Sequence, residues 1–212
     1  MPAADELIDI HTHVVPREFP AYVGRHLNVP WPSMADAQPC HKHVMISGSV
    51  YRTVSHQCWD CAVRLGDMDR QRVTRQVLSP MPELLSHWMQ PDDGAAMCRY
   101  LNDLIATMVA QAPTRFIGLG AVPLQDVARA IEELEFCMRE LGLAGVELGT
   151  HVAGVPIGDP RFLPFFEAAV AFNAAIFVHP LKPVGMERLL GPPILEQVLA
   201  FPSETGLAAA SM

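Results

Sequence analysis

The sequence predicts an α/β fold built on a parallel sheet, because short apolar strands alternate with longer segments of helical periodicity. The chain has 212 residues, half of them hydrophobic, which is enough for one domain with a sizeable core. No glycine-rich phosphate loop follows the first strand, so a dinucleotide-binding sheet is disfavoured. Histidines at the ends of two strands instead favour a (β/α)₈ barrel of the TIM type, incomplete here, with about five of the eight units present.

The expected strands are apolar runs that end in polar residues, glycine or proline. The first covers residues 7–13, and the later ones cover 74–79, 116–122, 144–149 and 175–178. Nearly continuous apolar runs of this kind are typical of parallel strands that are buried on both faces.

Segments of helical periodicity separate these strands. The predicted helices are 61–72, 94–110, 126–141, 161–172 and two shorter pieces at 194–201 and 204–211. Asp126 is suited to cap the third of these helices, and Gly142 to end it.

We interpret residues 1–212 as a single domain with a long insertion, residues 14–60, after the first strand. Within the insertion, β-prone runs on both sides of Ser47-Gly48-Ser49 predict a hairpin over 43–52. A loop of this length inside a compact domain usually has a function.

The composition restricts the classes of partner. The formal net charge is −8 and there is no basic run, which argues against nucleic acid. An anionic substrate must therefore be held by a local arginine, lysine or metal ion. The sequence shows neither a membrane-spanning apolar run nor a secretory pattern, and five irregularly spaced cysteines do not suggest a disulfide framework. A cytoplasmic location is expected.

Two histidines, His11 and His13, end the first strand. Alternate residues of a strand share a face, so both imidazoles should point to the same side at the carboxyl end. His179 ends the fifth strand in the same way. Imidazole is a common ligand of first-row transition metals, so the pattern predicts a metal site, although two unrelated loop histidines are an equal alternative for the first motif alone. Asp9 shares the face of His11 and is a candidate to support the site from behind the ligands.

Short motifs along the whole chain resemble those of the amidohydrolase superfamily. They are IDIHTH at 8–13, VYR at 50–52, CWD at 58–60, SHW at 86–88, RFIGLG at 115–120, GTH at 149–151 and FVHP at 177–180. The most similar branch is that of aminocarboxymuconate-semialdehyde decarboxylase and its relatives. The resemblance implies a metal-dependent hydrolase fold with zinc, or another divalent metal such as Mn²⁺, held by His11, His13 and His179.

The resemblance also implies a substrate site for a small carboxylated molecule. Arg52 matches the arginine that holds a substrate carboxylate in this family, and a guanidinium fork pairs well with a carboxylate. A solvated arginine on a hairpin is the alternative. His87 and Trp88, which follow the second strand, are candidates for the substrate pocket.

The family completes its site with an aspartate near the end of the eighth strand and a catalytic histidine after a later strand. Neither lies in this sequence, so no catalytic residue is assigned, and we expect the chain to be the N-terminal portion of a longer architecture. The leading function is a metal-dependent decarboxylase acting on a small carboxylated aromatic or muconate-type acid. A lactone or amide hydrolase of the same family, and a catalytically incompetent fragment with open strand edges, are the alternatives. The family's usual association implies a homodimer.

Other clusters of reactive residues are weaker candidates. The C-x-x-C at 58–61 has no partner pair, and the histidines at 40–43 lie in a polar loop where adventitious metal binding is the simpler interpretation. His151 could line the mouth of the barrel or form a structural hydrogen bond. Glu147 could lie near the metal or face a neighbouring layer.

Overall fold

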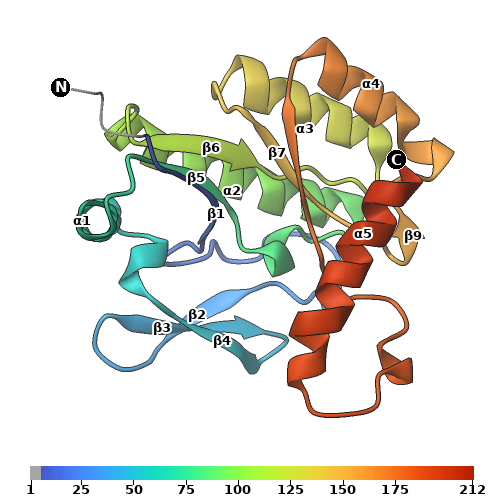
Figure 1. The fold of residues 1–212 in the computed structure, drawn as a ribbon, viewed down its shortest axis with the longest axis horizontal. Helices are drawn as coiled ribbons and strands as arrows, with labels where there is room; N and C mark the ends of the chain where they lie inside the picture. Colours follow the sequence, from blue (N-terminus) through green and yellow to red (C-terminus); the bar gives the residue numbers. More distant parts are fainter. Residues whose placement is uncertain (1–5) are drawn as a thin grey trace.

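A five-stranded parallel sheet forms the centre of the computed structural model, which describes residues 6–212 (Figure 1). Its order is β1-β5-β6-β7-β10, and each neighbouring pair is parallel. The strands are β1 (Ile8–Val14), β5 (Arg75–Pro80), β6 (Phe116–Gly120), β7 (Gly145–Gly149) and β10 (Ala175–His179). The prediction of an incomplete barrel is confirmed, because these strands follow one another in chain order with helices between them.

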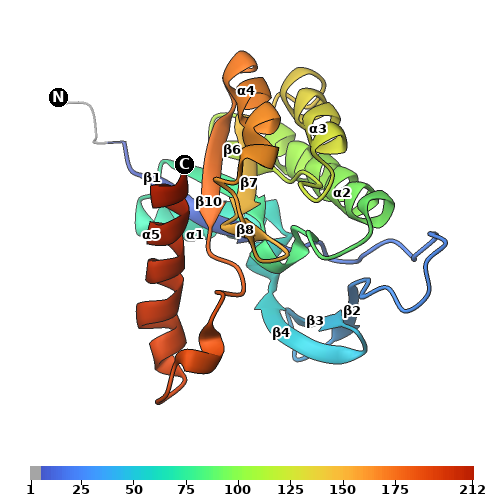
Figure 2. The ribbon, with the colours of Figure 1, turned by 90° about the vertical axis from the view of Figure 1, so that its right-hand side faces the viewer.

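The first four main helices connect successive strands of the sheet, and the fifth follows the last strand. They are α1 (Cys61–Gln71), α2 (Pro91–Gln111), α3 (Val127–Arg139), α4 (Leu163–Ala171) and α5 (Phe201–Ser211). Figure 2 shows α2, α3 and α4 on one side of the sheet and α5 on the opposite side of β10. Among the described residues, no helix combines the length and the apolar character needed to span a bilayer.

Several short helical turns supplement these elements. They are η1 (His56–Cys58), η2 (Pro82–Leu84), η3 (Pro160–Phe162), η4 (Met186–Arg188) and η5 (Glu196–Ala200), the last a π-helical turn. The two helical pieces predicted at 194–201 and 204–211 are in fact continuous, because η5 leads directly into α5. Pro202 lies in the first turn of α5, where its missing N–H costs nothing.

The insertion after β1 contains an antiparallel sheet of β2 (Ser33–Asp36), β3 (His41–Ile46) and β4 (Ser49–Ser55). The predicted hairpin is confirmed, with Ser47 and Gly48 both at positive φ, as a two-residue type I′ turn requires. The strand β2 was not predicted, nor was the small hairpin of β8 (His151–Val152) and β9 (Val155–Pro156).

The hydrophobic core lies between the sheet and helices α2 to α4. Leu78 on β5, Phe116 on β6 and Val146 on β7 are almost completely buried, as are Ile105 and Leu134 on the covering helices. Full burial of one such side chain contributes about 1.5–3 kcal/mol. The core therefore fixes the sheet, and with it the strand ends that carry the histidines.

The packing of β7 against β10 leaves no room for a side chain at Gly145. A Cβ atom there would lie 1.9 Å from the Ala175 carbonyl oxygen on the neighbouring strand. We expect Gly145→Ala to lower the free energy of unfolding by roughly 2–4 kcal/mol, measured by urea denaturation. The control is Gly206→Ala in α5, where no atom lies within 4 Å, and where we expect a gain of about 0.5–1 kcal/mol. Equal denaturation midpoints for the two variants would contradict this explanation.

Candidate metal centre

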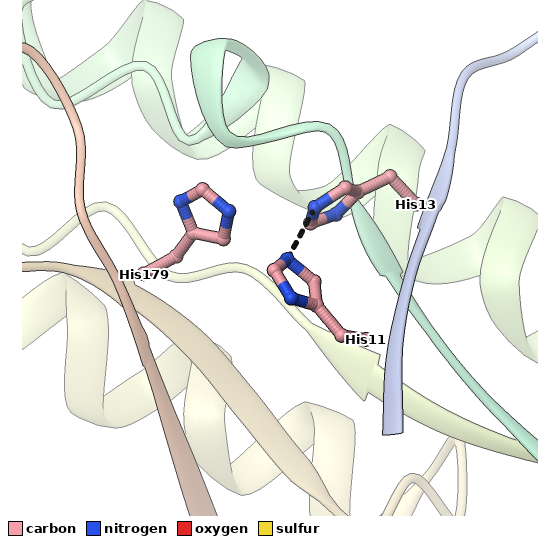
Figure 3. A group of neighbouring side chains, drawn as sticks. All are labelled: His11, His13 and His179. Atoms are coloured by element: carbon pink, nitrogen blue, oxygen red, sulfur yellow. Dashed lines mark hydrogen bonds between the residues drawn. The ribbon is translucent and has the colours of Figure 1, made fainter. Parts of the chain in front are cut away.

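His11 in the middle of β1, His13 near its carboxyl end and His179 at the carboxyl end of β10 converge on one another (Figure 3). One ring nitrogen of each residue lies within 4.8 Å of the others. The ring centroids of His11 and His13 are 5.1 Å from that of His179. The structure therefore brings together the three residues that the sequence predicts as metal ligands.

This convergence depends on the curvature of the sheet. β1 and β10 are the first and last strands in the sheet order, and in a flat sheet four strand spacings would separate them by about 19 Å. The observed contact between their histidines shows that the sheet curves like the wall of a barrel. The interior of that wall is where the imidazoles point.

The spacing of the imidazoles fits a shared metal ion. The Nε2 atoms of His11 and His13 are 3.2 Å apart. Two nitrogens bound to one zinc ion at the usual distance and a tetrahedral angle would be roughly 3.3 Å apart. The residues present therefore fit a first-row divalent metal, with His179 as the third nitrogen ligand.

Backbone carbonyl groups set the orientation of two of the rings. The Nδ1 atom of His13 lies 3.0 Å from the Pro80 oxygen, and that of His179 lies 2.7 Å from the Pro180 oxygen. A carbonyl oxygen can only accept, so each Nδ1 carries the proton and donates it, and Nε2 keeps its lone pair. Each ring is thus in the tautomer that can bind a metal through Nε2.

The environment also keeps these rings neutral. Burial, followed by the neighbouring His179 and His11, lowers the pKa of His13 to about 3. Burial also lowers the pKa of His179. A neutral imidazole has a free lone pair at physiological pH, so metal binding at His13 does not have to displace a proton.

Arg64 on α1 holds the strand that carries the first two histidines. Its buried guanidinium donates to the His13 carbonyl oxygen at 2.9 Å, and also to the side chains of Thr12 and Gln76. The pair Arg64-Leu65 is one of the motifs behind the family resemblance, but the sequence analysis assigned Arg64 no role at the site. The available indication was a charged residue on the apolar side of an amphipathic helix, which usually means a buried, hydrogen-bonded cation.

Asp9 supports the site through the main chain. Its carboxylate accepts a hydrogen bond from the His11 backbone N–H at 3.3 Å and one from the Gln76 side chain at 3.1 Å. The prediction that Asp9 lies near the site fits this placement, but the contact that the structure shows is to the backbone of His11 and not to its imidazole.

A small pocket opens beside the histidines. Its volume is about 160 Å³. Its charged and imidazole side chains are those of His13, Arg52, Glu83, His179, Lys182 and Glu196. Arg52 projects from β4, so the hairpin of the insertion reaches the metal centre, and the predicted substrate-binding arginine is placed where it can contact a ligand held there.

The other two predicted substrate residues lie outside the lining of this pocket. His87 is buried, packs close to Gly149, and has a pKa that burial lowers to about 4. Trp88 packs with Leu85, and its ring lies under the ammonium group of Lys182. Direct substrate contact by His87 and Trp88 stays a prediction, and the structure favours a supporting position for both.

Comparison with known proteins identifies the chain at the level of family. Residues 8–210 match the amidohydrolase family model. The chain belongs to the amidohydrolase family. It is 38% identical over 206 residues to 2-amino-3-carboxymuconate-6-semialdehyde decarboxylase of Dictyostelium discoideum, an alignment that covers 97% of this chain and 57% of that protein. It lies in the decarboxylase-like branch of the family.

Solved structures of this amidohydrolase branch show the same fold. A 5-carboxyvanillate decarboxylase from Sphingomonas paucimobilis has a TM-score of 0.66 and 32% identity, covering 71% of this chain and 45% of that one. A second structure is a dihydroxybenzoic acid decarboxylase from Polaromonas sp. with bound manganese and the inhibitor 2-nitroresorcinol. Its TM-score is 0.62 at 29% identity, and the match covers 70% of this chain and 48% of that one. The chain thus spans about half the length of these relatives.

Glu147 on β7 is a buried carboxyl group next to this amidohydrolase metal centre. Its Oε2 atom lies 3.8 Å from Nδ1 of His13, and among the described residues neither carboxyl oxygen has a hydrogen-bond partner. Burial raises the pKa of Glu147 to about 8, partly offset by nearby Ser79. Of the two interpretations open for Glu147, the structure supports a buried polar group near the metal site.

The remaining clusters do not add a site. Cys58 and Cys61 are free thiols, and burial raises the pKa of both. A raised pKa disfavours the thiolate form that redox chemistry and metal binding require. His151 accepts a hydrogen bond from the Gly154 N–H and contacts the Lys182 carbonyl oxygen, which is the structural role that the sequence left open.

The three histidines should bind one divalent ion per chain. After removal of loosely bound ions, we expect about one zinc or manganese per chain by elemental analysis, and a loss of affinity of more than about 100-fold in the double variant His11→Ala/His179→Ala. The matched control is Cys58→Ala/Cys61→Ala, which should keep the ion. Retention of metal by the histidine variant would show that the ion binds elsewhere.

Glu147 should make stability depend on pH. A raised pKa means that its stabilising contribution is complete below about pH 4.5 and is lost as the pH rises through 8. Glu147→Gln removes this loss. The unfolding free energy of the metal-free chain, relative to that of the variant, should therefore fall by up to roughly 5 kcal/mol between pH 4.5 and 8. Urea denaturation between pH 4.5 and 8 measures this difference in unfolding free energy, and the exposed Glu140→Gln serves as the control. A difference between the unaltered chain and Glu147→Gln that does not change with pH would contradict a raised pKa at Glu147.

Proposed function

We propose that this chain carries the metal-binding and substrate-binding residues of a divalent-metal-dependent decarboxylase that acts on small carboxylated aromatic or muconate-type acids. The observation that carries the proposal is that Arg52, His13 and His179 line one pocket and that His11 lies with the other two imidazoles beside it. The decarboxylases of known structure and sequence described above support the reaction type.

His11, His13 and His179 would hold the ion. Three neutral nitrogen ligands suit zinc, our first choice, while the manganese in the related structure makes Mn²⁺ the second choice. When bound, the ion supplies positive charge and an open coordination position for an oxygen of the substrate. Arg64 and the carbonyl groups of Pro80 and Pro180 keep the imidazoles in the geometry that this requires.

Arg52 would orient the substrate. Its guanidinium can form two parallel hydrogen bonds with a carboxylate, which fixes both the position and the rotation of the acid. Decarboxylation breaks the bond between the ring or diene carbon and the carboxyl carbon, the electron pair stays on the former, and a proton replaces carbon dioxide there. A carboxylate that is held in one orientation in a small pocket favours this bond cleavage over side reactions.

The experiment is a direct assay for carbon dioxide. The zinc- or manganese-loaded chain is incubated with 5-carboxyvanillate and with 2,6-dihydroxybenzoate, and released carbon dioxide and the decarboxylated product are quantified. We expect release that depends on the metal, and a loss of kcat/KM of at least about tenfold in Arg52→Met because the carboxylate loses a charge-assisted partner.

The control for this assay is Arg25→Met, which removes an exposed arginine on the rim of a different pocket. Hydrolysis of a lactone or amide substrate without carbon dioxide release would favour the hydrolase alternative. No release with either metal would contradict decarboxylation by this chain, and full activity of Arg52→Met would contradict the role of that arginine.

A further inference from the structure

The backbone that follows His179 forms one wall of the pocket at the metal centre. Pro180, Leu181 and Lys182 all line that pocket. This segment has few backbone donors with which to hold itself in place, because Pro180 and Pro183 have no N–H group. Interactions with other parts of the chain are therefore needed to fix its conformation.

The carbonyl group of Pro180 determines how His179 can bind a metal ion. The Nδ1–H group of His179 donates to this oxygen at 2.7 Å, which leaves Nε2 free to act as the ligand. The proline ring fixes φ, so the direction of the Pro180 carbonyl depends on ψ, and thus on where the next two residues are held. A shift of Leu181 or Lys182 would turn this carbonyl away from the imidazole.

Leu181 and Lys182 are held in different ways. Leu181 is buried and packs in a cluster with Leu85. Lys182 has a φ angle of +47°, in the left-handed region that residues with side chains seldom adopt. Such a conformation is unfavourable, and it persists only where the surrounding structure holds it.

His151 provides a hydrogen bond that holds Lys182. It lies in the hairpin of β8 and β9, beside the end of β10 (Figure 2). The Gly154 N–H donates to Nδ1 of His151 at 3.0 Å, so Nε2 carries the proton. Nε2 then donates to the Lys182 carbonyl oxygen, also at 3.0 Å. One imidazole thus connects the hairpin after β7 to the strained residue after β10.

We propose that His151 is a positioning residue for the metal ligand His179. The effect runs from the His151 imidazole to the Lys182 carbonyl. It continues through the backbone to the Pro180 carbonyl, which orients His179. Without the bond from His151, Lys182 would leave its unfavourable conformation and the Pro180 carbonyl would turn. The His179 ring would then no longer be held in the tautomer that binds through Nε2. The inference rests on the proposed function, in which His179 is a metal ligand.

Two amide variants separate this role from one confined to the hairpin. In His151→Asn the side-chain oxygen can replace Nδ1 as the acceptor for Gly154, but the shorter side chain does not reach the Lys182 carbonyl. In His151→Gln the amide nitrogen replaces Nε2 and can donate to that carbonyl, whereas the acceptor for Gly154 is lost. A role confined to the hairpin would survive in His151→Asn, and a role through Lys182 would survive in His151→Gln.

The first measurement is the affinity for zinc, from competition with a chromophoric chelator. We expect His151→Asn to weaken zinc binding about tenfold, and His151→Gln to weaken it less than about threefold. The matched control is His26→Asn, which changes an exposed histidine of the insertion. This control should bind zinc as the unaltered chain does.

The second measurement needs no metal. Long-range proton–nitrogen NMR spectra of the metal-free chain show which ring nitrogen of His179 carries the proton, and the signals are assigned by their loss in His179→Ala. We expect the Nδ1–H tautomer in the unaltered chain and in His151→Gln, and a mixture of both tautomers in His151→Asn. The backbone amide signals of the same samples show that each variant is folded.

Each outcome decides one claim. An unchanged zinc affinity, or an unchanged His179 tautomer, in His151→Asn would overturn the inference and leave the proposed function intact. A greater loss in His151→Gln than in His151→Asn would also overturn it, because the hairpin and not the Lys182 contact would then be responsible. Absence of zinc binding by the unaltered chain would contradict the proposed function, while the NMR spectra of the metal-free chain would still decide the role of His151.

Discussion

The curvature of the parallel sheet is the constraint on which the rest of this structure depends. It brings the first and last strands of the sheet order within contact of each other, although three strands lie between them. Once β1 and β10 carry histidines toward their carboxyl ends, the curvature of a barrel wall is enough to bring these side chains together. The core of buried residues under helices α2 to α4 maintains that curvature, so packing far from the histidines determines how closely their nitrogens approach.

The surroundings of His13 combine stabilising and costly interactions. The Pro80 carbonyl and the Arg64 guanidinium satisfy hydrogen bonds around the strand end and hold it in place. Glu147, in contrast, places a carboxyl group in the same interior without a hydrogen-bond partner among the described residues. A buried group of this kind lowers stability unless it has a partner in another state of the protein. Functional sites commonly contain such unfavourable groups.

Much of the fold was predictable from the sequence, because the relevant patterns are local. Apolar runs and helical periodicity located the five strands and the main helices, and the Ser47-Gly48 turn identified the hairpin. The short strands β2, β8 and β9 were missed because two to four residues do not establish an alternation. The sequence analysis predicted two separate helical pieces here, whereas η5 leads directly into α5 and Pro202 lies in the first turn of that helix.

The site was predictable in part. The three histidines could be predicted because each lies near the end of an apolar run that reads as a strand. Arg52 was predicted from the resemblance to the amidohydrolase superfamily. The orientation of Glu147 depends on contacts between segments far apart in the sequence, and no local pattern encodes it. The burial of Arg64 was indicated by its place on the apolar side of a helix, but its hydrogen bonds to Thr12, His13 and Gln76 were not. His87 follows β5 closely, but the side on which a residue lies after a strand ends is set by the loop, and here the loop buries it.

The central claim is that three imidazole nitrogens of this chain bind one metal ion. X-ray absorption spectroscopy on the chain loaded with one equivalent of zinc tests it most directly, because it counts and identifies the atoms around the ion. The account predicts three imidazole nitrogens at about 2.0–2.1 Å, with oxygen atoms completing the shell and no sulfur. A sulfur neighbour at about 2.3 Å, or a shell with at most one imidazole, would contradict it.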